Sequence, residues 1–302
     1  MNDFCCLSLL YISHLLIRLC YMNVDPNLKN LAIDDKIKVI KDEFSNDVFN
    51  ILEFTHNYKK VKLFHLDDDY LPSRIIADKK FYECDFLNFF SFFNADDHLV
   101  IDVGANIGNH SIYFSLVKNW DVIAFEPVRK NALCFSINAD LNNVSEKVTL
   151  LETALGKCEG SVLLSKSIGD NNGTFSRDAN KNNSTIKVSI MVLDDISQIK
   201  NSERSIGLIK IDVEGMEYDV LQGSVNTLKK HKPALAFECI THKDYTDIMN
   251  LLSPLGYFPV EVLNATATFI CLNKYNNIHM EKVSEYLTMY TEQRKIQEYK
   301  MF

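Results

Sequence analysis

A loop in the middle of the chain combines acidic, small and amide residues in a way that suits ligand binding. Residues 100–110 read VIDVGANIGNH, an apolar run that ends at Asp102 and continues into Gly104, Asn106 and Gly108. Glycine lets a backbone pass close to a ligand, and the N–H groups at the start of the helix expected after the loop attract anionic groups. The stretch therefore predicts a small-molecule site at the end of a strand.

A second acid closes the next apolar run. DVIAFEP, residues 121–127, ends with Glu126 and Pro127. In an open α/β sheet, ligands bind beyond the carboxyl ends of the strands, where the strand order reverses. We therefore expect Glu126 near the ligand of the glycine loop, where its carboxylate can accept both hydroxyls of a ribose.

Two classes of cofactor compete for this loop. A dinucleotide requires G-x-G-x-x-G, but Asn106 and Asn109 stand at the second and third glycine positions, and Asp102 would repel a pyrophosphate. S-adenosylmethionine instead carries an ammonium, a carboxylate and a cationic sulfonium. Asp102 can stabilise the ammonium, directly or through water, and N–H groups near Asn109 can meet the carboxylate. The residues favour S-adenosylmethionine over NAD.

The elements that must hold these residues alternate along the chain. Short continuous apolar runs, typical of strands covered on both faces, alternate with helical patterns from residue 99 on. Strands are predicted at residues 98–103, 121–127, 147–155, 205–213, 232–240, 256–263 and 267–273, and helices at 109–118, 128–141, 215–231 and 246–257. This order predicts an α/β fold with a doubly wound, mostly parallel seven-stranded sheet and an antiparallel edge strand.

The flanking segments are predicted to be additions to this domain of residues 98–273. Residues 1–22 form an apolar leader without a positively charged start or a small-residue cleavage site, which we interpret as an extra leader or a mis-assigned start, with a monotopic anchor as the alternative. Residues 23–97 are expected to form an α+β cap with little information on substrate. Residues 274–302 are expected to form a peripheral amphipathic helix, with partner binding as the alternative.

Local patterns within these segments make finer predictions. Inside the cap they predict a helix over residues 34–60, strands at 60–66 and 73–77, and a buried helix at 84–93. The insertion at residues 156–200 has strand character on both sides of a polar stretch. A loop this long is usually functional or disordered.

The composition of the chain indicates which classes of partner it can bind. The chain has 302 residues, a net charge of −8 and a pI of about 5.5, and no dense cluster of Lys and Arg, which argues against a nucleic-acid partner. Its eight cysteines include no C-x-x-C pair, a pattern that suits a reducing cytosol rather than a disulfide framework or a zinc site. We expect a cytoplasmic enzyme with a small-molecule or glycosyl acceptor and no membrane partner, and we make no prediction of oligomeric state.

Six segments follow one another along the chain: DVGANIGNHS, AFEP, ETALG, NNGTFS, IKIDVEGMEYDVLQG and ALAFE. Together, from about Phe81 to Tyr257, they resemble the FkbM family of S-adenosylmethionine-dependent methyltransferases. The resemblance implies a class I, Rossmann-like enzyme that methylates mostly hydroxyl groups of sugars or small metabolites. The cofactor positions that it implies are Asp102, Gly104, Asn106, Gly108 and Glu126, with Ala154 and Leu155 packed on the adenine and Asp212 beside the sulfonium.

Methyl transfer to a hydroxyl requires a group that takes the proton, because a sugar hydroxyl has a high pKa. Asp212, Glu238 and His242 are the candidates, all expected at the carboxyl edge of the fourth and fifth core strands. Asp212 ranks first because its position at the strand end agrees with the family motif. His242 is second, because histidine is the usual proton acceptor near neutral pH.

Further residues are candidates for contact with the acceptor. Asn172 and Gly173 could close over the cofactor or acceptor, or form a polar turn, and Glu214 and Glu238 could bind acceptor hydroxyls. Asp212, Glu214 and Glu238 could alternatively hold Mg²⁺, which takes oxygen ligands, although our prediction includes no metal.

Two other functions compete with methyl transfer. One is a nucleotide-dependent oxidoreductase, opposed by Asn106 and Asp102. The other is a non-catalytic cofactor-binding or interaction protein, opposed by the presence of Asp102, Glu126 and Asp212 together. The choice among O-, N- and carboxyl-methylation stays open, because these differ mainly in the pKa of the acceptor.

Overall fold

A seven-stranded sheet forms the centre of the protein. The structure is a computed structural model that describes residues 31–67, 69–93, 99–166, 175–176 and 185–299. The strands lie in the order β12-β13-β11-β10-β3-β4-β5. Their bounds are β3 (Leu99–Val103), β4 (Asp121–Phe125), β5 (Val148–Leu151), β10 (Ile206–Ile211), β11 (Ala234–Glu238), β12 (Tyr257–Leu263) and β13 (Thr268–Asn273).

The sheet is doubly wound and mostly parallel, as predicted. β5, β4, β3, β10 and β11 pair in parallel, whereas β13 is antiparallel to both of its neighbours. The antiparallel strand lies one position in from the edge, because β12 takes the edge itself. The strand order reverses between β3 and β10, which makes the carboxyl ends of these two strands the place for a ligand.

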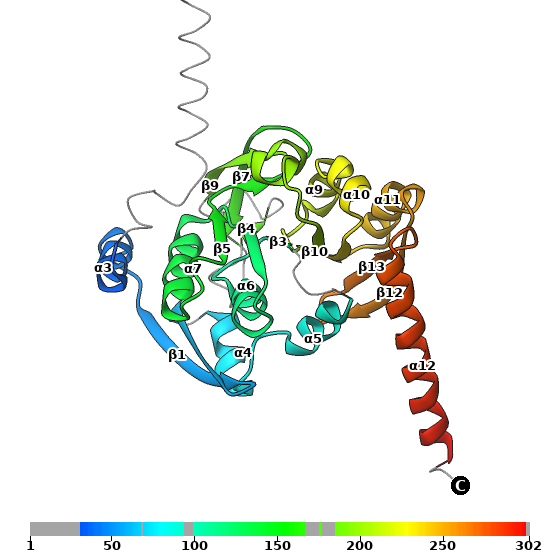
Figure 1. Ribbon diagram of the computed structural model, residues 1–302. Coiled ribbons are helices and arrows are strands. Elements are labelled where there is room, and N and C mark those ends of the chain that lie inside the picture. The colour runs from blue at the N-terminus through cyan, green and yellow to red at the C-terminus, as the bar shows by residue number, and fades with distance from the viewer. Residues whose placement is uncertain (1–30, 68, 94–98, 167–174, 177–184, 300–302) are drawn as a thin grey trace, which may run out of the picture.

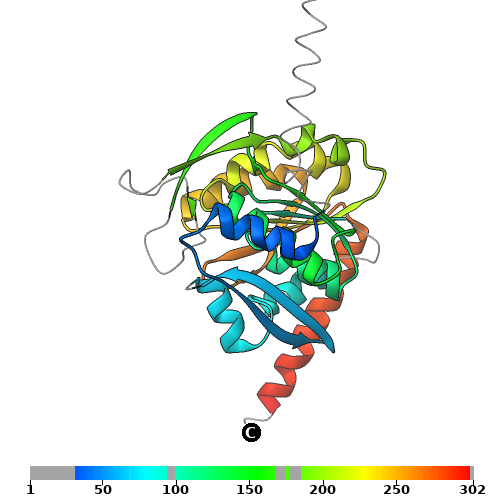
Figure 2. The same cartoon turned by 90° about the vertical axis from the view of Figure 1, so that its left-hand side faces the viewer.

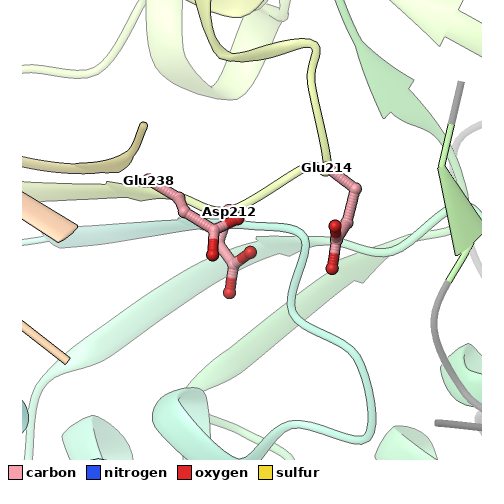
Figure 3. A group of neighbouring side chains, drawn as sticks. All are labelled: Asp212, Glu214 and Glu238. Atoms are coloured by element: carbon pink, nitrogen blue, oxygen red, sulfur yellow. The ribbon is translucent and has the colours of Figure 1, made fainter. Parts of the chain in front are cut away.

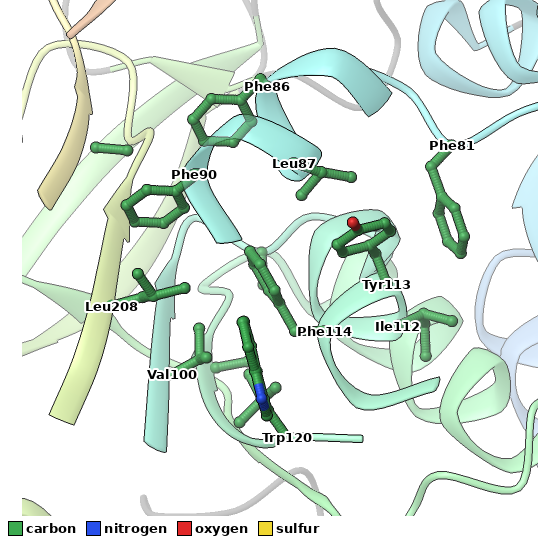
Figure 4. Packing of buried hydrophobic residues seen from close by; sticks show 14 of the residues in the cluster. Phe81, Phe86, Leu87, Phe90, Val100, Ile112, Tyr113, Phe114, Trp120 and Leu208 are labelled. Atoms are coloured by element: carbon green, nitrogen blue, oxygen red, sulfur yellow. The ribbon is translucent and has the colours of Figure 1, made fainter. Parts of the chain in front are cut away.

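Each face of the sheet is covered by helices, because successive side chains of a buried strand point to opposite faces. On one face, α5 (Cys84–Phe92) and α6 (Asn109–Ile112) pack against β3 and β10 through an aromatic cluster that includes Phe90, Phe114 and Trp120 (Figure 4). On the other face lie α8 (Ser197–Lys200), α9 (Glu217–Gln222), α10 (Val225–His231) and α11 (His242–Leu252). Asp102 and Lys210 follow the parity of Val100 and Leu208 and so point to the α6 face.

The N-terminal segment contains α3 (Ile33–Glu43), β1 (Phe49–His56), β2 (Lys59–Leu66), α4 (Tyr70–Asp78) and α5. The prediction of one helix over residues 34–60 was wrong: burial alternates over residues 52–55 of β1, and Asn57 and Tyr58 have φ values of 46° and 63°, which suit a tight hairpin turn. The strand predicted at 73–77 is part of α4, where the Asp69 side chain accepts a hydrogen bond from the Tyr70 N–H at the helix start. The hairpin and α4 lie at the end of the molecule away from α9–α11 (Figures 1 and 2).

The insertion after β5 forms a small second sheet. Its strands are β6 (Ala154–Leu155), β7 (Gly160–Lys166), β8 (Phe175–Ser176) and β9 (Thr185–Met191), in the order β6-β9-β7-β8. The strand predicted over 147–155 is therefore two strands in two sheets. A 3-10 turn (Leu193–Asp195) and α8 lead back to the main sheet.

Three helices also differ from the predicted ranges. The helix expected at 109–118 is α6 followed by a π-helical turn (Tyr113–Val117), and α11 begins at His242, before the expected 246. The helix expected at 215–231 is split into α9 and α10 at Gly223, where an added Cβ would lie 2.2 Å from the Gly156 carbonyl oxygen.

Two more helices complete the description. α7 (Arg129–Leu141) packs against α3 and β2. α12 (Asn277–Tyr299) extends away from the body of the protein (Figure 1). Among the residues described, no helix has both the length and the apolar character needed to cross a membrane.

Candidate active site

A cavity of about 380 Å³ lies at the carboxyl ends of β3, β4, β10 and β11. Most of the residues singled out from the sequence line it: Gly104, Asn106, Asn109, Glu126, Pro127, Ala154, Leu155, Asp212, Glu214 and Glu238. The topology explains this, because parallel strands bring their carboxyl ends to one edge of the sheet. Asn172 and Gly173 lie outside the residues that the structure describes.

The glycines of the loop serve close backbone packing. Gly104 has a φ of 77°, and a Cβ added to it would lie 1.8 Å from the backbone oxygen of Asp212. Gly108 has a φ of 88° and packs against the Phe135 ring, and it does not line the cavity. Only glycine therefore lets the end of β3 approach the end of β10 this closely.

Glu126 is buried at the end of β4 and holds the loop through its carboxylate. Oε2 accepts a hydrogen bond from the Asn106 N–H at 2.8 Å, and Oε1 accepts one from the Val128 N–H at 2.9 Å. Burial raises the pKa of Glu126 to about 7, against the lowering effect of these hydrogen bonds. Oε1 also accepts a hydrogen bond of 3.5 Å from the Asn131 side-chain amide, so it is Oε2 that keeps a lone pair for a hydroxyl donor from the cavity.

Asp102 occupies a different place from the one expected. Its side chain is fully buried on the α6 face of the sheet and does not line the cavity. Oδ2 accepts a hydrogen bond of 2.6 Å from the Ser111 hydroxyl, and Oδ1 lies 3.3 Å from Lys210 Nζ. Direct contact between Asp102 and a ligand ammonium, one of the two modes that we expected, is not available in this arrangement.

Lys210 was missed in the sequence analysis. It lines the cavity, and its Nζ donates to the Gly104 carbonyl oxygen at 2.9 Å and lies 3.5 Å from Asp212 Oδ2. The signal was present: Lys210 interrupts the apolar run IGLIKI and stands two residues before Asp212, on the same face of the strand. A buried lysine is normally paired, and this one is.

Asp212, Glu214 and Glu238 form an acidic cluster at the cavity. Their ligand atoms lie within 4.8 Å of one another, and Figure 3 shows the carboxylates turned toward a common space. Burial and the neighbouring Asp212 carboxylate raise the pKa of Glu214 to about 7 and of Glu238 to about 8. Three carboxylates at this spacing have the oxygen donors that Mg²⁺ takes, so a metal is an alternative use of the cluster.

The segment that carries Glu214 is held in an unusual conformation. Glu214 has a φ of 53°, in the left-handed region that non-glycine residues rarely adopt. The buried Glu217 carboxylate accepts hydrogen bonds from the Val213 N–H at 3.0 Å and the Gly215 N–H at 3.1 Å. These bonds fix the turn and aim the Glu214 side chain at the cavity.

His242 does not line the cavity. It is the exposed first residue of α11, and its Nδ1 lies 3.3 Å from the Thr246 hydroxyl on the same helix. The chain leaves the sheet after Glu238, and the Thr241 side chain caps α11, which carries His242 away from the strand ends. The expectation that His242 lies at the site is corrected.

The N-terminal segment, which we expected to carry little information on substrate, contributes directly to the cavity. Tyr70, Leu71, Tyr82 and Glu83 line one wall. The two tyrosine rings meet edge to face at 6.2 Å between centroids, and Glu83 Oε2 lies 3.4 Å from His110 Nε2. Sequence patterns alone do not reveal which side of the sheet such a segment covers.

A sheet of this strand order, with a glycine loop after its first core strand and an acid after its second, defines a class I, Rossmann-like methyltransferase fold. The family model described as "Methyltransferase FkbM domain" matches residues 102–259, more than half of the chain. The chain belongs to the FkbM methyltransferase family.

Relatives share only part of their length with this chain. "Methyltransferase 1" of Beauveria bassiana (strain ARSEF 2860) is 28% identical over 148 residues, which cover 42% of this chain. The match covers 59% of that protein, less than two thirds of its length.

Solved structures give distant matches. A methyltransferase FkbM from Methylobacillus flagellatus KT matches with a TM-score of 0.43 and 20% identity, over 59% of this chain and 44% of that one. A precorrin-6y C5,15-methyltransferase from Geobacter metallireducens GS-15 matches with a TM-score of 0.39 and 14% identity, over 62% and 86% of the two chains.

Proposed function

We propose that this methyltransferase uses S-adenosylmethionine and methylates a hydroxyl group of a sugar or another small polar metabolite. One observation carries the proposal: a single cavity gathers the Gly104 loop, Glu126 and Asp212 at the strand ends. The net negative charge of the chain and the acidic cavity support a small-molecule or glycosyl acceptor rather than a nucleic acid, and the cysteine pattern supports a cytoplasmic enzyme.

The residues of the cavity fit this cofactor. Glu126 is buried, held by two backbone N–H groups and the Asn131 amide, and its Oε2 keeps a lone pair for a ribose hydroxyl. Ala154 and Leu155 offer an apolar wall suited to an adenine. When bound, S-adenosylmethionine supplies an activated methyl group, and the acidic cavity complements its positive charge.

The acids at the strand ends would have different roles toward the acceptor, one as the proton acceptor and the others in orienting it. Asp212, with 42% of its side chain exposed, is placed to take the proton of an acceptor hydroxyl. Glu238, with a pKa of about 8, keeps its proton at neutral pH and can donate a hydrogen bond to another acceptor oxygen. Alignment of the acceptor by Glu238 and Glu214 would supply much of the rate.

The first test is calorimetric titration of the full chain with S-adenosylhomocysteine. We expect one site per chain in the wild type and loss of binding in Glu126→Ala, because that change removes both the loop anchor and the hydroxyl acceptor. Glu146→Ala, at a glutamate outside the cavity, is the control. A folded wild-type chain that binds nothing, or an E126A variant with wild-type affinity, would contradict the proposal.

If S-adenosylhomocysteine binds as expected, the next experiment is to identify the acceptor. Transfer of an isotopically labelled methyl group to a panel of neutral sugars, amino sugars and small polyols would identify it. Transfer to amines or carboxylates but to no hydroxyl would replace O-methylation with another reaction of the same site.

A further inference from the structure

Lys210 is a buried charge that the proposed reaction does not use. Its side chain is 5% exposed, and its Nζ lies 2.9 Å from the Gly104 carbonyl oxygen, 3.3 Å from Asp102 Oδ1 and 3.5 Å from Asp212 Oδ2. The ammonium donates a hydrogen bond to the Gly104 carbonyl and lies within ion-pair distance of the two carboxylates, so three oxygen-bearing groups surround it. They come from the end of β3, from the loop after it and from the residue after β10.

The Lys210 side chain stays protonated and positively charged. Burial works against the ammonium, but the carboxylates of Asp102 and Asp212 raise the pKa of Lys210 above that of an ordinary lysine. Lys210 and Asp102 are direct partners in the register of β10 and β3, so the pair is built into the strand pairing. Because Asp102 has no exposure to solvent, it needs this cation.

The loop that Lys210 contacts is held from two sides. On one side, the Asn106 N–H donates to Glu126. On the other, the Gly104 carbonyl accepts from Lys210, at a point where Gly104 already touches the backbone of Asp212. Loss of the ammonium would free the loop and the Asp212 side chain at the same time.

We propose that Lys210 is a positioning residue of the methyl-transfer site. Its ammonium fixes the Gly104 carbonyl and the Asp212 carboxylate relative to each other, so that the cofactor loop and the proton-accepting acid share one geometry. This inference rests on the proposed function and deepens it. A residue that merely neutralised Asp102 would become dispensable once both charges were removed.

That contrast gives the experiment, in which the full chain is titrated with S-adenosylhomocysteine and its thermal unfolding is measured. Lys210→Met should lower the unfolding temperature, because Asp102 is left buried and unpaired, and should weaken affinity about tenfold or more. The double variant Asp102→Asn/Lys210→Met should regain much of the unfolding temperature, since the amide oxygen that it introduces can still accept from Ser111, but its affinity should stay weak.

A second buried lysine supplies the matched control. Lys36 is also 5% exposed, and its Nζ lies 2.5 Å from Asp140 Oδ2 on α7, but it does not line the cavity. Lys36→Met should therefore lower the unfolding temperature and leave the affinity for S-adenosylhomocysteine unchanged.

Two outcomes would overturn the inference alone. Wild-type affinity in K210M would remove any role in the site, and recovery of both stability and affinity in D102N/K210M would reduce Lys210 to a neutraliser of Asp102. Absence of binding by the wild-type chain is a separate result, which would overturn the proposed function and this inference with it.

Discussion

At the scale of single residues, neighbouring carboxyls at one strand edge acquire different properties from their surroundings. Asp212 lies beside the Lys210 ammonium and is partly exposed, whereas Glu238 is more desolvated and faces two other acids, which raises its pKa to about 8. At neutral pH this raised pKa keeps Glu238 protonated, so Glu238 is poorly suited to accept a proton. The position of Asp212 at the strand end beside Lys210 makes it the candidate base, and Glu238 is left to orient the acceptor.

The assignment of Asp212 predicts the effect of one substitution. Asp212→Asn should lower turnover by roughly 10²- to 10⁴-fold at saturating methyl donor, the usual contribution of a general base. The measurement is the rate of labelled methyl transfer to a hydroxyl acceptor found in the panel. His242→Gln, assayed beside it, should keep wild-type turnover because this imidazole is exposed and outside the cavity. The reverse pattern would exchange their roles.

At the scale of elements, the Asp194 side chain caps the first turn of α10, after the break that separates α9 from α10. Asp194 accepts hydrogen bonds from the backbone N–H groups of Asn226 and Thr227 and from the Thr227 hydroxyl, all at 2.7–2.8 Å. Its own N–H donates to the Gly223 carbonyl at the break. An acid from a distant segment thus satisfies the free N–H groups of the first turn of α10.

Removal of this cap should cost stability. Asp194→Ala should lower the free energy of unfolding by about 1–2 kcal/mol, the usual value for a lost helix cap, measured by urea denaturation. The neighbouring Asp195 is exposed, and its ion pair with Lys200 is long at 3.8 Å, so Asp195→Ala should stay within about 0.5 kcal/mol of wild type. Equal effects of the two changes would refute the capping role.

At the scale of the whole molecule, several buried acids link stability to pH. Burial raises the pKa of Glu126 and Glu214 to about 7 and, together with neighbouring acids, that of Glu238 to about 8, from a usual value of 4.5. The folded chain therefore binds protons more tightly than the unfolded chain does. The contribution of these three groups to the free energy of unfolding is fully present below pH 4.5, their pKa in the unfolded chain. It is lost as the pH rises through the folded-state pKa values of about 7 and about 8.

We therefore expect the unfolding temperature of the ligand-free chain to fall between about pH 6.5 and about pH 8.5, the interval that spans these raised pKa values. Burial lowers the pKa of His56 and His231 from 6.5, and these groups act in the opposite direction below that pH, so the trend is clearest above it. Glu214→Gln/Glu238→Gln should flatten the decline, and Glu146→Gln, outside the cavity, should not. An unfolding temperature of the wild type that rises over this interval would contradict the raised pKa values.

Local sequence patterns were sufficient to predict the sheet and the edge of the sheet at which the cavity lies. Runs such as HLVIDV and DVIAFEP are short, apolar and separated by helical patterns, which predicts buried parallel strands whether or not other elements are known. Because parallel strands present their carboxyl ends at one edge, the acids that follow them, Glu126 and Asp212 among them, had to meet there.

Which side chains reach the cavity depended instead on packing between distant segments. Asp102 and Lys210 are cross-strand partners on the same face, yet Asp102 is fully buried against Ser111 of α6 while Lys210 reaches the cavity. Tyr82 and Glu83 line the cavity although they precede the first strand of the main sheet in the sequence. His242 lies outside the cavity because α11 begins at this residue and leads away from the strand ends. Burial depends on the elements that cover each face, and those contacts join residues far apart in the chain, beyond the range of local sequence patterns.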